Sequence, residues 1–245
     1  MFNGFTKNAT EFLAGIRANN NKAWFEQHKS IYQSEVYEPM CELAAELFKP
    51  YKDLDGMMFK AGRIYKDPFL SPEIRYRDTM WLQIRHEAMW WNKTPAFFFE
   101  LSPEGAVFGF KLPKPDASVM ELFRMQIGDE RDLFLSLINK AEQDGSIEIV
   151  TDEYKRRKPG FTKFNEKYFN IRGISIHRTI TDGRTLYSKK LKDHISKTFD
   201  ELFEIEEYFN DLVVTDGVIR ARREIQLSEP GEAVMPKAPD VEFMW

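Results

Sequence analysis

Arginine, lysine and aromatic side chains are concentrated in residues 63–81, which read Arg-Ile-Tyr-Lys-Asp-Pro-Phe-Leu-Ser-Pro-Glu-Ile-Arg-Tyr-Arg-Asp-Thr-Met-Trp. Guanidinium groups form paired hydrogen bonds with carboxylate or phosphate oxygens, and this is the usual reason to cluster them. The stretch therefore predicts a site for a small anionic ligand, a phosphate or a carboxylate, at the rim of a sheet. The residues expected to form this site are Arg63, Tyr65, Lys66, Arg75, Tyr76, Arg77 and Trp81.

A structural role explains the same charges equally well. Asp67 and Asp78 lie close in sequence to the arginines. The pairs Arg63–Asp67 and Arg77–Asp78 would then close a loop over the sheet. Structural ion-pair networks of this kind can look like functional sites in a sequence. The sequence leaves both interpretations open, and neither requires catalysis.

No catalytic or metal-binding motif accompanies the stretch. The chain contains no glycine-rich phosphate loop and no G-x-S-x-G nucleophile turn. One cysteine, Cys41, cannot build a structural zinc site, and its helical neighbours predict a buried thiol. The four histidines share no ligand spacing: His28, His86, His177 and His194. We therefore expect no metal and no cofactor, and the sequence leaves open whether the protein is an enzyme and which residues would be catalytic.

Composition and charge restrict the class of protein. Of 245 residues, 42% are hydrophobic and 30% charged, with 21 phenylalanines available for a core. The net charge of -4 argues against nucleic acid as a partner. No apolar run reaches the ~18 residues of a membrane span, and a single cysteine suits a reducing compartment. We expect a soluble cytoplasmic protein with no membrane contact and an undetermined oligomeric state.

The charges are unevenly distributed along the chain. Residues 151–197 contain 13 lysines and arginines against 5 acidic residues, whereas residues 198–245 contain 4 against 12. The two segments either neutralise each other within the fold or form an interaction surface. The second case gives an alternative function, a protein-interaction module that uses the basic surface of residues 151–197 and an acidic, proline-containing tail. The basic run 155–158 beside Phe161 is typical of a solvated loop, with a nucleic-acid contact as the weaker interpretation.

Helices are predicted before and after a group of strands. Asn8 is expected to cap a helix over residues 9–18, and Asn21 a second helix that Pro39 either kinks or restarts. Helices capped by Ser118 and Asp129 are expected over 118–127 and 130–143, with a long one over 189–213. Two segments, 213–219 and 222–227, are ambiguous.

Strands are predicted between these helices. In residues 79–87, Met80, Leu82 and Ile84 alternate with Trp81, Gln83 and Arg85, which is the pattern of a half-buried strand. Ser-Pro-Glu-Gly at 102–105 indicates a tight hairpin turn. The other predicted strands are 58–66, 96–101, 106–111, 147–151 and 173–181.

Together these elements predict an α+β fold. We expect a central, mainly antiparallel sheet covered by helices, with an N-terminal helical pair and a long C-terminal helix. Residues 1–228 are expected to form a single domain, and residues 229–245 an extended acidic tail that docks in cis or in trans.

Two blocks of the chain resemble the family catalogued as domain of unknown function 2461. The first block includes Gly4-Phe5, Phe12-Leu13, Asn19-Asn20-Asn21-Lys22-Ala23-Trp24-Phe25, Tyr32 and Pro39. The second includes Arg63-Ile-Tyr-Lys-Asp67, Ser71 and Tyr76-Arg77-Asp78-Thr-Met-Trp81. The resemblance covers most of residues 2–213 and implies a soluble, mostly bacterial, single-domain protein, with no established activity, ligand or catalytic residue.

The chain departs from the family pattern within the second block. The family block usually reads like Arg-Phe-Ser-Lys-Asp-Lys before its tyrosine, whereas residues 69–74 here read Phe-Leu-Ser-Pro-Glu-Ile. Several basic positions are therefore missing. An anion bound at this site should be held more weakly, or through Arg75 and Arg77 instead.

Overall fold

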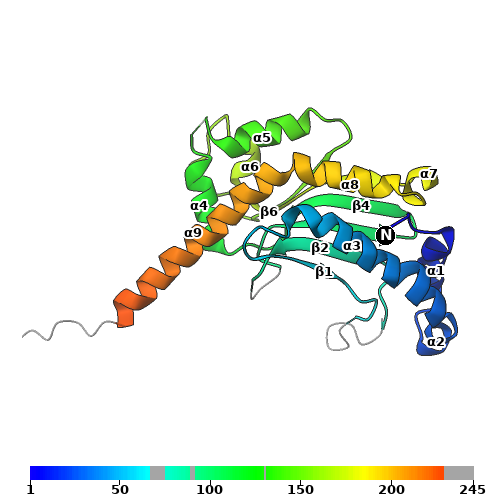
Figure 1. The fold of residues 1–245 in the computed structure, drawn as a ribbon. Coiled ribbons are helices and arrows are strands. Elements are labelled where there is room, and N and C mark those ends of the chain that lie inside the picture. The colour runs from blue at the N-terminus through cyan, green and yellow to red at the C-terminus, as the bar shows by residue number, and fades with distance from the viewer. Residues whose placement is uncertain (67–74, 89–91, 130, 229–245) are drawn as a thin grey trace, which may run out of the picture.

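A six-stranded antiparallel sheet forms the centre of the computed structural model, which describes residues 1–66, 75–88, 92–129 and 131–228 (Figure 1). The strand order is β1-β2-β3-β4-β6-β5, and every neighbouring pair is antiparallel. The strands are β1 (Met57–Ala61), β2 (Met80–His86), β3 (Ala96–Ser102), β4 (Gly105–Leu112), β5 (Glu148–Glu153) and β6 (Ile171–Ile180). The predicted α+β class and antiparallel sheet are confirmed, as is the hairpin between β3 and β4.

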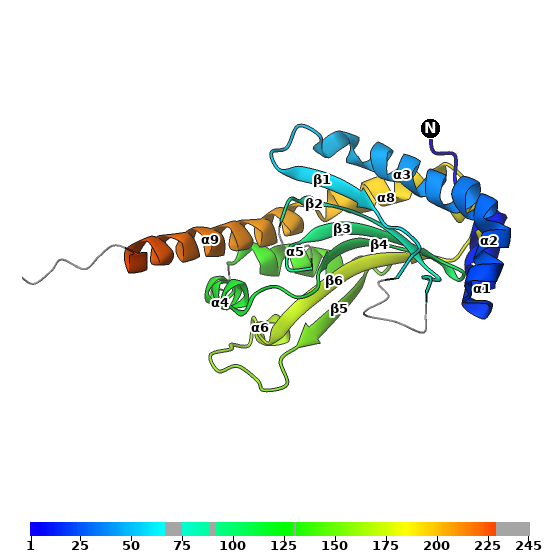
Figure 2. The same ribbon diagram turned by 90° about the horizontal axis from the view of Figure 1, so that it is seen from below.

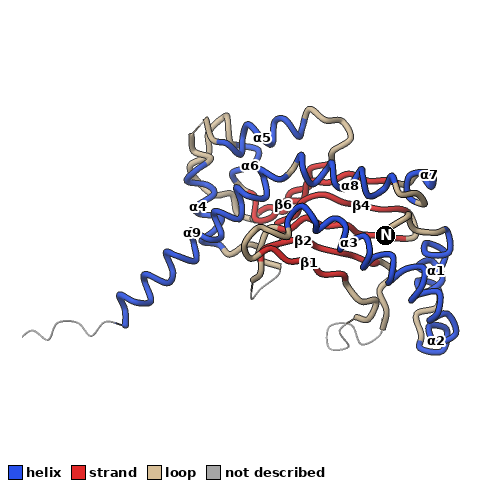
Figure 3. Tube along the Cα trace, in the orientation of Figure 1, coloured by secondary structure: helices blue, strands red, loops and turns tan. Residues whose placement is uncertain are grey.

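Helices cover one face and the ends of the sheet, and no described helix covers its other face (Figures 2 and 3). Helix α3 contacts β1 and β2, α1 contacts β3, and α8 contacts β4. The helices are α1 (Lys7–Ala18), α2 (Lys22–Ile31), α3 (Glu38–Phe48), α4 (Ala117–Gln126), α5 (Leu133–Glu142), α6 (Glu166–Phe169), α7 (Gly183–Leu186), α8 (Lys190–Glu201) and α9 (Phe203–Ser228). The described helices contain no stretch that is long and apolar enough to cross a membrane.

Aromatic rings fill the space between the sheet and the helices. Phe97 and Phe110 are directly opposite each other on β3 and β4, and both are fully buried. The ring of Phe97 stacks on Phe199 of α8 at 4.8 Å, and Phe110 stacks on Phe209 of α9 at 5.8 Å. Such pairs contribute about 0.5–1.5 kcal/mol beyond the area they bury. They fix α8 and α9 against the middle of the sheet.

The N-terminal helices differ from prediction at their ends. Asn21 caps α2 as predicted and accepts a hydrogen bond from the Trp24 N–H at 3.0 Å. Asn8 does not cap α1, because that helix begins at Lys7 after an extended Thr6. Between α2 and α3 the chain remains helical through the short π-helix η1 (Tyr32–Tyr37), and Pro39 lies in the first turn of α3. Proline is tolerated there because the first-turn N–H has no helical partner.

The later helices also begin at unexpected residues. Asp132, and not Asp129, caps α5 by accepting from the Phe134 N–H at 2.9 Å. Asp116 precedes α4, so Ser118 lies inside the helix. The helix predicted over 189–213 is two helices, α8 and α9, which separate at Leu202. No glycine or proline marks this break, and α9 includes both ambiguous segments. Cys41, expected to be buried, is partly exposed.

One carboxyl group is buried without a partner. Glu206 of α9 is 1% exposed, and its Oε1 makes no hydrogen bond. Burial, together with the negative charges of Glu207 and Asp211, raises the pKa of Glu206 to about 8. The neutral acid is therefore the form that the folded protein prefers at neutral pH, because removing a charge from water is costly.

We predict that Glu206→Gln flattens the decline of stability with pH. The pKa of Glu206 is raised on folding, so the folded state binds the proton more tightly, and wild-type stability falls as pH rises from about 4.5 to about 8. The loss is on the order of 4 kcal/mol. Denaturant unfolding at pH 5, 7 and 9 measures it, with exposed Glu204→Gln as the control. Equal slopes for Glu206→Gln and wild type would contradict this prediction.

Candidate functional site

The arginine-rich stretch forms two antiparallel arms that continue beyond β1 and β2. The Lys66 N–H donates to the Arg75 carbonyl at 3.0 Å, and the Arg77 N–H donates to the Ile64 carbonyl at 2.7 Å. Tyr65 and Tyr76 are paired across the arms. Strand β1 thus ends at Ala61, short of the predicted 58–66. The segment between the arms, including Asp67, lies outside the described residues.

The connection between α1 and α2 holds these arms in place. The Asn20 side chain donates to the Tyr76 carbonyl at 2.9 Å and accepts from the Tyr76 N–H at 3.0 Å. The Tyr76 ring is 4% exposed and stacks on Phe25 at 4.5 Å. Tyr32 accepts a longer bond from the Ile64 N–H at 3.4 Å. Tyr76 therefore anchors the arms in the core.

Four of the predicted site residues line one pocket of about 510 Å³ at the rim of the sheet. They are Arg63, Tyr65, Arg77 and Trp81, joined by Tyr37, Lys60, Ala61 and Gly62. Lys66 and Arg75 do not line it, and Tyr76 is turned into the core. Sequence analysis missed Lys60 and Tyr37. Lys60 belongs to β1 and Tyr37 to the π-helix η1, so both lie outside the stretch 63–81 from which the site was predicted.

Among the described residues, the lining of this pocket carries positive charge and no carboxylate. Lys60, Arg63 and Arg77 are its charged residues. In the part of the chain that the structure describes, neither arginine side chain makes a hydrogen bond or an ion pair. Asp78, which we expected beside Arg77, instead accepts from Arg17 Nε at 2.6 Å. The alternative pair Arg77–Asp78 is thus replaced by Arg17–Asp78, and the pair Arg63–Asp67 lies partly outside the described residues.

Gly62 shapes the aromatic wall of the pocket. A Cβ atom added to Gly62 would lie 2.3 Å from the Trp81 indole, far inside van der Waals contact. The Gly62 N–H also donates to the Trp81 carbonyl at 2.7 Å. Because glycine has no side chain, the indole lies directly over the backbone at the end of β1.

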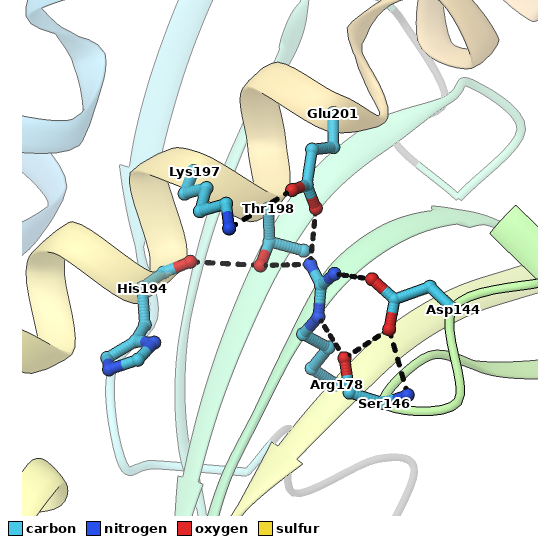
Figure 4. A network of polar contacts seen from close by, with 7 residues as sticks. All are labelled: Asp144, Ser146, Arg178, His194, Lys197, Thr198 and Glu201. Atoms are coloured by element: carbon cyan, nitrogen blue, oxygen red, sulfur yellow. Dashed lines mark hydrogen bonds and ion pairs between the residues drawn. The ribbon is translucent and has the colours of Figure 1, made fainter. Parts of the chain in front are cut away.

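Arg178 of β6 has a structural role and can be compared with Arg63 and Arg77 (Figure 4). It donates to Asp144 at 2.6 Å, Ser146 at 2.9 Å, and Thr198 and Glu201 at 2.7 Å each. These bonds join β6 to α8 and to the loop after α5. All of its nitrogens are used within the protein, in contrast to Arg63 and Arg77.

Six of the 13 lysines and arginines in the basic segment 151–197 pair with acidic residues in the described part of the chain. Its ion pairs in the described residues are Arg157–Glu166, Lys167–Glu142, Arg172–Asp152, His177–Glu148, Arg178–Asp144, Arg178–Glu201, Lys192–Glu46, Lys192–Asp193 and Lys197–Glu201. Glu201 is the partner that comes from the acidic half of the chain. The tail of residues 229–245 lies outside the described part. Within the described ranges, no group of histidine, cysteine and acidic residues is arranged to hold a metal.

A sheet with helices on one face and an arginine-lined pocket at its rim defines an α+β protein with a candidate anion site. The chain belongs to the family described as Conserved hypothetical protein (DUF2461), whose model matches residues 8–208. This match confirms the resemblance seen in the sequence, and it includes both the asparagine-rich connection and the pocket. No curated protein matches the chain.

We predict that Asn20→Ala destabilises the protein by about 1–3 kcal/mol, the cost of leaving buried backbone groups without partners. The substitution removes both hydrogen bonds to Tyr76. Urea unfolding measures the change. Asn19→Ala is the matched control, because Asn19 makes one exposed side-chain bond, to the Gly15 carbonyl. Equal destabilisation by the two substitutions would argue against a clamp at Tyr76.

Proposed function

We propose that this protein binds a small ligand carrying a phosphate or carboxylate group in the pocket of Arg63, Tyr65, Arg77 and Trp81. The observation that supports this is a pocket whose described lining has three cationic side chains and no carboxylate. Cations that serve only the fold are generally paired, as Arg178 and Arg17 are. Unpaired guanidinium groups around one concavity are suited to an anion that comes from solution.

Each lining residue has a role in the proposal. The planar guanidinium groups of Arg63 and Arg77 each donate hydrogen bonds to two oxygens of the anion, and the ammonium group of Lys60 supplies a third positive charge. Tyr65 is 50% exposed and forms one wall, with the Trp81 indole as another. Aromatic walls with a few convergent polar groups are typical of small-molecule sites. Lys66 and Arg75 stand beside the pocket, where their charge attracts an anion without touching it.

Thermal shift with inorganic phosphate, pyrophosphate, citrate and adenosine monophosphate tests the proposal. A ligand at 100 times its dissociation constant stabilises the folded state by about 2.7 kcal/mol. We expect Arg63→Ala and Arg77→Ala each to weaken binding roughly tenfold, since a charge-assisted hydrogen bond is worth about 1.5–3 kcal/mol. Arg223→Ala is the control, because Arg223 is an exposed arginine at the far end of α9.

The salt dependence of binding separates specific recognition from general attraction. A site that uses paired hydrogen bonds retains binding in 0.15 M salt, where long-range attraction is screened beyond ~8 Å. Hits that bind equally well to wild type, Arg63→Ala and Arg77→Ala would show that this pocket is not the site.

A further inference from the structure

The loop between β5 and α6, residues 154–165, concentrates positive charge on a part of the surface that projects from the body of the protein (Figure 2). It contains Lys155, Arg156, Arg157, Lys158 and Lys163 and no acidic residue. The net charge of -4 is the sum over the whole chain, so the chain outside this loop carries -9. The β5–α6 loop is thus a basic surface on an otherwise acidic protein.

Two asparagines hold this loop in place. The Asn170 side chain donates to the Tyr154 carbonyl at 2.9 Å and accepts from the Lys158 N–H at 3.2 Å. Asn165, which is fully buried, accepts from the Thr162 N–H at 2.7 Å and donates to the carbonyl that follows α4 at 2.9 Å. Both halves of the loop are therefore bonded to buried groups, and the side chains between them are presented in a defined arrangement.

Three cations of the loop have no acidic partner in the described ranges. Lys155, Arg156 and Lys163 are exposed, and none of them forms an ion pair with a described residue. Arg157 differs, because it pairs with Glu166 at 2.6 Å. The unpaired cations are available to an anionic partner that comes from solution, and their spread along the loop suits a partner with several negative groups.

Two phenylalanine rings are exposed between these cations. Phe161 is 40% exposed, and the Arg157 guanidinium lies over its ring at 3.9 Å. Phe164 is 58% exposed, and none of the described rings stacks on it. The Tyr154 ring, in contrast, already lies under the Lys158 ammonium at 4.9 Å. Phe161 and Phe164 therefore offer aromatic surface on which a planar group can stack.

Cations interspersed with exposed rings match the chemistry of a single-stranded nucleic acid. Its phosphates are negative at regular intervals, and its unpaired bases have faces that stack on aromatic side chains. A duplex holds these faces inside the helix. A flat anionic membrane would bring lipid charge near the acidic remainder of the surface, whereas a flexible strand contacts the loop alone, and charges beyond ~8 Å are screened at 0.15 M salt.

We propose that the β5–α6 loop binds a short single-stranded nucleic acid. Lys155, Arg156 and Lys163 contact phosphates, while one base stacks on Phe164 and another on Phe161. Because phosphates and ring faces carry little sequence information, binding should depend only weakly on base sequence. This surface is separate from the rim pocket, since β1 and β5 form opposite edges of the sheet.

Fluorescence anisotropy with short labelled oligouridylate and oligothymidylate tests this proposal. We expect binding at about 0.05 M salt, with a slope of about 2 in log Kd against log salt for three phosphate contacts. Phe164→Ala should weaken binding about tenfold, equivalent to 1.4 kcal/mol. This loss is within the range for stacking of one base on an aromatic side chain.

Charge-reversed variants separate local contacts from general attraction. Lys155→Glu combined with Arg156→Glu should abolish oligonucleotide binding. Lys189→Glu combined with Lys190→Glu is the matched control, because it changes the net charge equally at two exposed lysines where α8 begins, and it should bind nearly as wild type does. Inorganic polyphosphate, which has the charges without the bases, should bind Phe164→Ala as it binds wild type.

The substituted side chains are exposed, so the variants should keep the wild-type melting temperature. The proposal is overturned if neither oligonucleotide binds at the lower salt concentration, or if Phe164→Ala binds as tightly as wild type. Equal losses in the two double variants would also overturn it, because net charge alone would then explain the attraction. Binding to phosphatidylserine vesicles without binding to either oligonucleotide would overturn the class of partner.

Discussion

The stacking of aromatic rings between one face of the sheet and its helices is the constraint on which the rest of the structure depends. Phe97 against Phe199 and Phe110 against Phe209 place α8 and α9 over β3 and β4. Strand geometry then forces the alternating residues onto the opposite face, whatever their polarity. Arg85 is buried there and Lys111 half-buried, as a consequence of the register that places the phenylalanines in the core.

Two pairs of arginines differ in how their donors are used. Arg178 and Arg17 donate hydrogen bonds to carboxylates from distant parts of the chain and so join elements together. Arg63 and Arg77 contact no carboxylate in the described ranges, although they lie at a rim where acidic residues are near in sequence. Since exposed ion pairs contribute only about 0–1 kcal/mol, their absence costs little stability. The free donors are therefore compatible with the fold and available to a ligand.

The three consecutive asparagines explain how a polar loop can organise the rim. Asn19 closes the end of α1, Asn21 caps α2, and Asn20 pairs with both backbone groups of Tyr76. Short amide side chains suit this task because they donate and accept within one planar group. The first and second family blocks, separated by 23 residues in sequence, are thus parts of one structural unit. The candidate site depends on both.

The sequence by itself determined the fold class, the antiparallel hairpin, the cap at Asn21 and the family, because periodicity and turn chemistry are local properties. It also identified Arg63, Tyr65, Arg77 and Trp81, which the structure brings together around one pocket. Only the tertiary structure decided that Asp78 pairs with Arg17, that Lys60 and Tyr37 join the pocket, and that Tyr76 belongs to the core. It alone revealed the buried cation Arg85. These outcomes depend on which distant segments meet, and that is set by packing across the sheet, which no local pattern records.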